Sequence, residues 1–332
     1  MQQPPANPTT VRRIALLQHG GLLGLHGKTG ISLLRYRASD IVAVIDQDTA
    51  GRDAGDVTRI AQVKGVPIVA SVQEALAFKP EVIAIGIATP GGKLPDAWLE
   101  ELRTAVRAGV SLWNGLHVPL AKDPVIASAV NDRVYVWDMR QEPAGLPVAS
   151  AAARNLACRR VLFVGTDMAI GKMTAALELD RSAKARGLRS KFIATGQTGM
   201  MIAGDGIPLD AVRIDFSGGA VESEMMKHGP AHDSLWVEGQ GSLVSPASTA
   251  TLPLMRGSQA THLILVHLAR MKTLRAFPFV KVPPLRDVIR LNELVASAAG
   301  GLAPAKVVGV ALNTWGLSDA EAAAECEQTE RE

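Results

Sequence analysis

A glycine-rich stretch with a lysine, "GTDMAIGKMT" from Gly165 to Thr174, carries the clearest chemistry in this chain of 332 residues. It follows an apolar run and precedes a helical pattern, which places Gly171 and Lys172 at the N-terminus of a helix. Unpaired backbone N–H groups and the helix dipole favour an anion there, and the lysine adds a full positive charge. The stretch therefore predicts a phosphate-binding loop.

Two features set this loop apart from the usual one. Five residues rather than four separate Gly165 from Gly171, and Met173 stands where a Ser or Thr normally binds magnesium. A thioether cannot replace a hydroxyl as a ligand to Mg²⁺, and Thr174 lies about 100° further round the helix. Phosphate binding is expected, whereas phosphoryl transfer is not favoured. The residues expected to hold the phosphates are Gly165, Thr166, Asp167, Gly171, Lys172, Met173 and Thr174.

The longer spacing has a precedent in another enzyme group. "GTDMAIGKMT" resembles the loop of dethiobiotin synthetase and its relatives, in which Gly-Thr-Asp opens a longer loop that ends in Gly-Lys-Thr. "LWVEGQGS", from Leu235 to Ser242, is similar to that group's strand ending in Val-Glu-Gly. The resemblance implies that Glu238 faces the phosphate site. A surface acid at a strand end is the other interpretation of Glu238.

The first half of the chain holds a second loop with the same spacing. In "GLLGLHGKTG", five residues separate Gly21 from Gly27, and Lys28 and Thr29 follow, so the hydroxyl is in place. The pattern leaves two interpretations open: a second anion site at residues 26–30, or a plain strand-to-helix turn. A G-x-G-x-x-G fingerprint is absent, so a nicotinamide site is not favoured.

Alternating apolar runs and helical patterns predict two doubly wound parallel-sheet domains, the fold class α/β. We expect a flexible leader over residues 1–11, a first domain over 12–145, and a second over 150–325. The first domain should hold strands Ile14–Gln18, Ile41–Asp46, Pro67–Ala70, Val82–Ile87, Ser111–Asn114 and Val134–Trp137. The second should hold strands Val161–Val164, Lys191–Ala194, Val212–Phe216, Leu235–Val237, His262–Val266 and Lys306–Leu312.

The composition of the chain limits the kinds of molecule that the protein is expected to bind. The formal net charge is only +3 and aromatic residues make up 4%, so a nucleic-acid surface is not expected. The chain has two cysteines with no zinc or disulfide spacing, which suits a reducing cytoplasm. No apolar run reaches the length of a membrane span, and the first residues lack an export signal. We expect a cytoplasmic homo-oligomer that acts on a small molecule, without nucleic acid, membrane or metal.

Residues 12–325 resemble one family over their whole length: the D-glutamate N-acetyltransferase-like family, long described as a domain of unknown function. The stretches that carry the resemblance are "KTGISLLRY", "GGKLPDAW", "NGLH", "GTDMAIGKMTAALEL", "FIATGQTGMMIAGDGIPLDAV", "DFSGGAVE", "VEGQGSL" and "PPLRDVIRLNE". It implies a Rossmann-like first domain, a P-loop-type second domain, and transfer of acetyl from acetyl-CoA to the amine of D-glutamate. Coenzyme A supplies phosphates that a loop with a lysine can bind without turnover, so Met173 suits this reaction.

Such a transfer needs three kinds of group. A base must remove a proton from the substrate ammonium, because only the neutral amine attacks a thioester. Donors must stabilise the oxyanion on the thioester carbonyl, and further donors must hold the substrate carboxylates. The candidate bases are Glu222, Glu238 and His267. The candidate substrate-binding residues are Lys28, Thr29, Arg35, Gln197 and Thr198, with Gly196 as a further backbone donor.

Three hypotheses follow. The leading one is an acetyl-CoA-dependent N-acetyltransferase acting on D-glutamate or a similar small acidic amino acid. An ATP-dependent ligase or kinase of the dethiobiotin synthetase type, with ATP and Mg²⁺, is the enzymatic alternative. A non-catalytic protein that binds a nucleotide or CoA needs only the phosphate loop.

Overall fold

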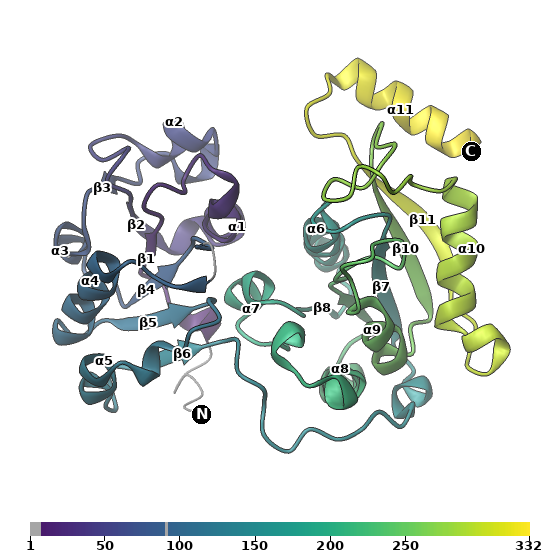
Figure 1. The fold of residues 1–332 in the computed structure, drawn as a ribbon, viewed down its shortest axis with the longest axis horizontal. Helices are drawn as coiled ribbons and strands as arrows, with labels where there is room; N and C mark the ends of the chain where they lie inside the picture. Colours follow the sequence, from purple (N-terminus) through teal and green to yellow (C-terminus); the bar gives the residue numbers. More distant parts are fainter. Residues whose placement is uncertain (1–7, 90–91) are drawn as a thin grey trace. The chain divides into compact units, whose positions relative to one another are not determined.

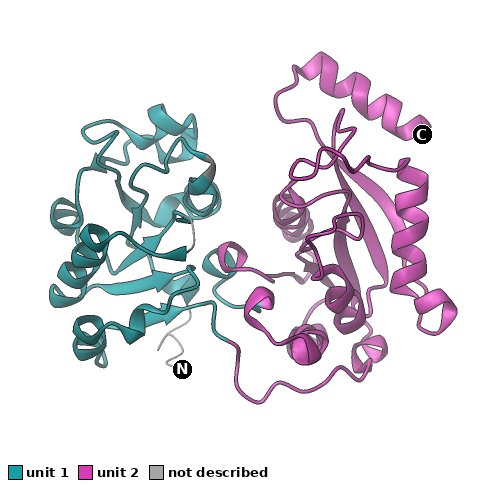
Figure 2. Ribbon diagram, in the orientation of Figure 1, with its two compact units in different colours: residues 1–141, 200–208 teal, residues 142–199, 209–332 magenta. Residues whose placement is uncertain are grey.

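The chain divides into two compact units, coloured teal and magenta in Figure 2, which we describe separately. The computed structural model describes residues 8–89 and 92–332. Unit 1 comprises residues 1–141 and 200–208, and unit 2 comprises residues 142–199 and 209–332. Residues 1–7 of the expected leader lie outside the described part. Pro8 and Val11 of the same leader are buried and accept hydrogen bonds from Arg37, so residues 8–11 pack on unit 1.

Unit 1 is built on a six-stranded parallel sheet in the order β3-β2-β1-β4-β5-β6 (Figure 1). This is the strand order of a Rossmann-like domain, as predicted. Nearly every strand residue is buried, because helices cover both faces of a parallel sheet. The strands are β1 (Ile14–Leu17), β2 (Ile41–Ile45), β3 (Ile68–Val69), β4 (Val82–Ile85), β5 (Ser111–Asn114) and β6 (Val136–Asp138). The helices are α1 (Lys28–Tyr36), α2 (Ala54–Thr58), α3 (Val72–Ala75), α4 (Asp96–Arg107) and α5 (Pro124–Ala129).

Unit 2 is built on a five-stranded parallel sheet in the order β11-β10-β7-β9-β8. The central strand β7 pairs with β10 on one side and β9 on the other, so the chain reverses direction across the sheet beside β7. Ligands of open α/β sheets bind at such a reversal, outside the carboxyl ends of the strands. The strands are β7 (Arg159–Gly165), β8 (Ser190–Ile193), β9 (Ser234–Val237), β10 (His262–Leu268) and β11 (Lys306–Asn313).

The helices of unit 2 lie around this sheet (Figure 1), and one of them corrects the sequence prediction. They are α6 (Lys172–Ala185), α8 (Ile214–His228), α9 (Thr251–Ser258), α10 (Leu285–Ala296) and α11 (Asp319–Arg331). Helix α7 (Gln197–Ala203) begins in unit 2 and ends in unit 1. The strand predicted at Val212–Phe216 is wrong, because α8 begins there. Ile214, at the centre of this predicted strand, is 68% exposed, so the alternation of apolar and polar residues does not mark a buried strand face. The other predicted strands are present to within two residues at each end.

The described residues contain no helix that is both long enough and apolar enough to cross a membrane.

Candidate functional site

The phosphate loop, residues 165–174, lies at the carboxyl edge of the unit 2 sheet, as its sequence predicts. Strand β7 ends at Gly165 and helix α6 begins at Lys172, so the loop connects the central strand to a helix N-terminus. The Thr166 N–H donates to the Val266 carbonyl over 3.1 Å. Gly165 is paired with Val266, which places the next residues, Thr166 and His267, side by side. The loop therefore opens at the point where the sheet reverses direction.

Side chains from elsewhere in unit 2 fix the shape of the loop. The Asp167 carboxylate accepts from the N–H groups of Met168 at 2.7 Å and Arg275 at 2.9 Å. The Asn313 amide donates to the Ile170 carbonyl over 2.7 Å. Gly171 has a φ of +113°, a conformation that other residues rarely adopt. The loop is thus held in place before any ligand arrives.

The backbone of this loop has free donors. Within residues 8–89 and 92–332, no hydrogen-bond acceptor faces the N–H groups of Ala169, Ile170 and Gly171. The first turn of α6, which follows directly, adds further N–H groups that a helix cannot satisfy internally. Successive free N–H groups at the positive end of a helix dipole form an anion-binding site.

Lys172 supplies the charge of this site. Its side chain is only 5% exposed, and its Nζ donates to the Asp167 carbonyl over 2.7 Å. Two glycines make room for it: a Cβ on Gly165 would lie 3.1 Å from Nζ, and a Cβ on Gly239 would lie 2.9 Å from Cδ. Gly239 belongs to the "VEGQG" stretch, so the two motifs predicted to form one site do meet around this lysine.

The first turn of α6 offers no hydroxyl at the residue after the lysine. Met173 is half-buried at that place, and Thr174 is exposed. The Thr166 hydroxyl, which is fully buried, lies instead 2.9 Å from Nδ1 of His267. The loop can therefore bind phosphate through its backbone N–H groups and the Lys172 ammonium. It lacks the hydroxyl that usually binds Mg²⁺ at this position.

Glu238 is buried at the end of β9, and its recorded hydrogen bonds are to Thr195 at the end of β8. Its Oε2 accepts from the Thr195 N–H over 2.9 Å, and its carbonyl accepts from the Thr195 hydroxyl over 2.9 Å. The Gln240 amide also binds the Thr195 carbonyl. These contacts hold the turn that leads into α7, where the predicted residues Gln197 and Thr198 lie. A catalytic role for Glu238 stays a prediction.

From the sequence, Gly218 and Gly219 suggest a turn at a strand end just before Glu222, and the structure corrects this expectation by placing Glu222 within a helix. It is a buried residue of α8, and its Oε2 accepts from the N–H and the hydroxyl of Ser150, both over 2.9 Å. The Gly-Gly pair that suggested a turn is helical: a Cβ on Gly219 would collide with the Pro147 carbonyl. The glycines thus let residues 147–150 approach α8, and the contacts recorded for Glu222 hold this segment.

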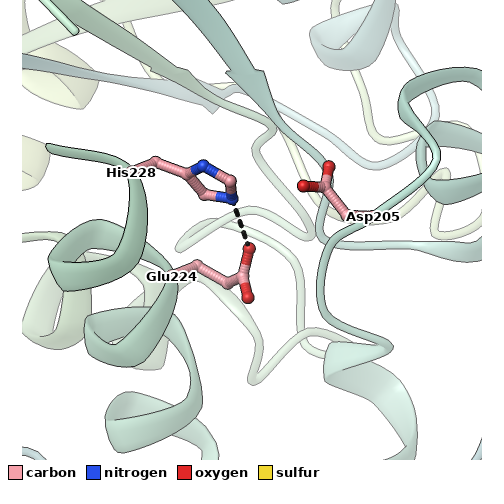
Figure 3. A group of neighbouring side chains, drawn as sticks. All are labelled: Asp205, Glu224 and His228. Atoms are coloured by element: carbon pink, nitrogen blue, oxygen red, sulfur yellow. Dashed lines mark ion pairs between the residues drawn. The ribbon is translucent and has the colours of Figure 1, made fainter. Parts of the chain in front are cut away.

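Further along α8, Glu224 and His228 are one turn apart (Figure 3). Oε2 of Glu224 and Nε2 of His228 are 3.2 Å apart, an ion pair when the histidine is protonated. Asp205, which is drawn with them, belongs to unit 1.

His267 is the candidate base that meets the phosphate loop directly. It is 9% exposed, and burial lowers its pKa from the ordinary value of 6.5, while the negative charge of Glu332 acts in the opposite direction. It also lines a pocket of about 480 Å³, which we call the α11 pocket because residues of α11 form one wall. The imidazole is therefore held largely neutral between the phosphate loop and a pocket.

The second Gly-rich loop, in unit 1, has a different backbone. Its N–H groups donate within the loop, from Gly21 to Gln18, from Gly24 to Gly21 and from Gly27 to Gly24. The Gly30 N–H donates to the Gly86 carbonyl over 2.9 Å. Of the predicted substrate-binding residues on α1, Thr29 is buried, whereas Lys28 and Arg35 are exposed. The N–H groups of these four glycines are already bonded within unit 1, whereas that of Gly171 in the phosphate loop is free within the part of the chain that the structure describes.

Sequence reasoning missed two residues that shape the phosphate loop, Arg275 and Asn313. Asn313 ends β11, and Arg275 lies in the segment after β10. Arg275 lies in "LARMKTLRAF", a basic stretch directly after a predicted strand. Because the carboxyl ends of parallel strands meet at one edge of the sheet, a basic stretch directly after a strand could have predicted that Arg275 lies near the phosphate loop.

Fold and site together define a P-loop-type protein with a Rossmann-like N-terminal unit. Two family models match the chain: a Rossmann-like domain over residues 47–142 and a P-loop domain over residues 147–332, both described as domains of unknown function of DUF1611. The chain belongs to the DUF1611 family. A crystal structure of a DUF1611 family protein from Anabaena variabilis is similar throughout, with a TM-score of 0.92 and 54% identity over 97% of this chain and 93% of that one.

Two curated relatives have named activities. A protein of Tritonibacter scottomollicae named D-glutamate N-acetyltransferase is 36% identical over 264 residues, 78% of this chain and 77% of the relative. A protein of Pseudoalteromonas with the same name is 31% identical over 260 residues, again 78% of this chain and 77% of the relative. The chain is accordingly an enzyme of the N-acetyltransferase class.

Proposed function

We propose that this enzyme transfers the acetyl group of acetyl-CoA to the amine of D-glutamate. The observation that carries the proposal is the joint position of a phosphate loop without a magnesium hydroxyl and a buried, largely neutral histidine. The names of the two relatives supply the donor group and the acceptor.

The phosphate loop suits the donor substrate. Coenzyme A carries a pyrophosphate and a 3′-phosphate, and either can take the free N–H groups of residues 169–171 and the charge of Lys172. No phosphoryl group moves in this reaction. A magnesium ligand after the lysine is therefore dispensable, and Met173 fits that position.

His267 suits the proton transfer. In one tautomer, its Nδ1–H donates to the Thr166 hydroxyl and Nε2 carries the lone pair. Nε2 then accepts a proton from the acceptor ammonium. The freed amine attacks the thioester carbonyl carbon, and a C–N bond forms while the carbonyl electrons move to the oxygen. Collapse of this intermediate breaks the C–S bond, and the proton that the nitrogen then loses passes to the leaving thiolate. The products are the N-acetyl amino acid and CoA, and the first proton leaves His267 for water.

The histidine's environment supports this role. A base works best when its pKa lies near the working pH and it is unprotonated there. Burial lowers the pKa of His267, so the imidazole is neutral at pH 7. His267 also contacts the phosphate loop through Thr166 and lines the α11 pocket, and this double position favours it as the base.

The test is a direct assay. The protein is incubated with acetyl-CoA and a panel of D- and L-amino acids, and free thiol is followed together with the mass of the product. We expect thiol release with D-glutamate at a higher kcat/KM than with L-glutamate. Absence of thiol release above background with every amino acid contradicts the proposal. Magnesium-dependent ADP release from ATP in the same panel supports the ligase alternative.

A further inference from the structure

His267 lines the α11 pocket, and nothing in the reaction above yet uses this pocket. Its walls come from residues 267–285, Leu312 of β11 and residues 325–332 of α11 and its end, all within unit 2. About 480 Å³ is a volume typical of small-molecule sites. The lining residues are His267, Ala269, Arg270, Met271, Lys272, Lys281, Val282, Pro283, Pro284, Leu285, Leu312, Glu325, Gln328, Thr329 and Glu332.

Two lysines, Lys272 and Lys281, line this pocket. The Val282 N–H donates to the Lys272 carbonyl over 2.9 Å, and Thr273 bridges to Lys281, so residues 272 and 281 are held close by backbone pairing. Both side chains are exposed, and across the part of the chain that the structure describes neither ammonium has an ion pair or a hydrogen bond. Two neighbouring cations without partners are suited to an anion with two charged groups.

Arg270, the third cation that lines the pocket, is already paired with carboxylates. The Arg270 guanidinium binds Glu325 at 2.6 Å and Glu321 at 3.0 Å, which fastens α11 to the end of β10. Glu332 accepts from the Leu285 N–H over 3.3 Å and faces His267 closely enough to oppose the lowering of its pKa. The pocket thus offers two free cations, Lys272 and Lys281, and one carboxylate, Glu332, that Arg270 does not neutralise.

This charge pattern matches an amino acid with two carboxylates and one ammonium group. The lysines complement the carboxylates, and the Glu332 carboxylate complements the ammonium beside His267. Coenzyme A, by contrast, carries several negative charges and no cation near its pantetheine, so Glu332 disfavours it. We infer that the α11 pocket binds the acceptor amino acid, a small dicarboxylate, with Lys272 and Lys281 as its carboxylate partners.

In this arrangement the two substrates meet at one imidazole, that of His267. The donor's phosphates take the phosphate loop, and the acceptor's amine reaches His267 from the α11 pocket. Segment 269–285 joins the two sites, because its Arg275 N–H binds Asp167 of the phosphate loop while Lys272 and Lys281 flank the pocket. The inference rests on the proposed function, which supplies the acceptor.

The test is steady-state kinetics of the whole enzyme with both substrates varied. In the double variant Lys272→Ala/Lys281→Ala we expect KM for D-glutamate to rise about tenfold or more, since each lost bond joins two charged groups. KM for acetyl-CoA should change less than threefold. A second variant, Gln328→Trp, fills the pocket from the exposed face of α11 and should raise the same KM without touching a lysine.

Two control variants match the loss of charge. Lys184→Ala/Lys306→Ala removes two exposed lysines of unit 2 that do not line the pocket. Lys28→Ala/Arg35→Ala removes the two cations of unit 1 that the sequence suggested for the same carboxylates. We expect neither control to raise KM for D-glutamate more than twofold. Far-UV circular dichroism and the melting temperature confirm that each variant is folded.

The outcomes separate the inference from the function on which it rests. A wild-type enzyme that fails to acetylate D-glutamate overturns the proposed function. An active wild type whose pocket variants keep their KM for D-glutamate, or raise KM for acetyl-CoA instead, overturns the inference alone. A rise in KM confined to Lys28→Ala/Arg35→Ala moves the acceptor site to unit 1 and also overturns it.

Discussion

His267 Nδ1 and Thr166 Oγ1 lie 2.9 Å apart, both buried, at the adjacent carboxyl ends of β10 and β7. Thr166 is the second residue of the phosphate loop, so the loop that would hold the donor substrate also orients the candidate base. In our account this contact couples binding of the donor to removal of a proton from the acceptor. It also selects one tautomer of the imidazole.

Thr166 is therefore expected to act as a positioning residue. Thr166→Val keeps the volume and removes the hydroxyl, and we expect kcat to fall about tenfold, the effect of one lost hydrogen bond in a buried site. KM for acetyl-CoA should change little. Thr166→Ser restores the hydroxyl and should restore kcat. If Val and Ser variants have the same kcat, the contact has no role in orienting His267.

His267→Gln should lower kcat by roughly 10²–10⁴-fold, the usual contribution of a general base. CoA affinity, measured by calorimetry, should remain within threefold of the wild type, because the phosphate loop is unchanged. A variant that loses binding and kcat together points instead to a structural role for this histidine.

The pH dependence of kcat follows from the same residue. Burial lowers the pKa of His267 below 6.5, and the base acts only when unprotonated, so kcat should rise with pH through an acid limb below pH 6.5. Glu332 opposes this lowering, so Glu332→Gln should move the limb to lower pH. An acid limb of kcat above pH 6.5, or a limb that Glu332→Gln moves to higher pH, contradicts the assignment of His267 as the base.

Lys172 should dominate the affinity for CoA. Lys172→Met keeps most of the side-chain volume that packs beside Gly165 and Gly239 but removes the charge. We expect the Kd for CoA to rise about 10- to 100-fold, because the lost bonds join a cation to phosphate. Lys28→Met, in the unit 1 loop whose N–H groups are already bonded, is the matched control and should change the Kd less than twofold. Equal effects of the two substitutions would falsify the assignment of the phosphate site to unit 2.

Met173 distinguishes acetyl transfer from ATP chemistry. Met173→Thr introduces the hydroxyl that a magnesium site needs after the lysine. We expect acetyl transfer to D-glutamate to stay within threefold of the wild type and magnesium-dependent ATP hydrolysis to remain at background. The appearance of ADP on adding D-glutamate, in either protein, identifies a ligase or kinase.

The sequence predicts the fold well where periodicity is strong. Apolar runs such as Val82–Ile85 are buried on both faces, so their composition alone marks them as strands. The stretch around Ile214 misleads because local alternation competes with a helix stabilised by tertiary packing. Gly218 and Gly219 suggest a turn in isolation, yet here they allow close contact with residues 147–150. That contact joins residues about 70 positions apart and has no local signature.

The candidate site likewise has one part that the sequence predicts and another that only the folded chain brings together. The phosphate loop and the meeting of Lys172 with Gly239 are predictable, because short motifs encode a strand, a turn and a helix in sequence order. The hydrogen bond between Thr166 and His267 is not, since it depends on the pairing of β7 with β10. The α11 pocket is assembled from three separate segments, so only the folded chain brings Lys272, Lys281 and His267 together.

The most direct test of the account is detection of the new bond itself. The enzyme is incubated with acetyl-CoA labelled with ¹³C at the carbonyl and with ¹⁵N-labelled D-glutamate, and the product is followed by NMR, with His267→Gln in parallel. The account predicts a one-bond coupling between ¹³C and ¹⁵N that appears with the wild type at a rate equal to thiol release, and much more slowly with the variant. Thiol release without that coupling, or no coupling at all, contradicts it.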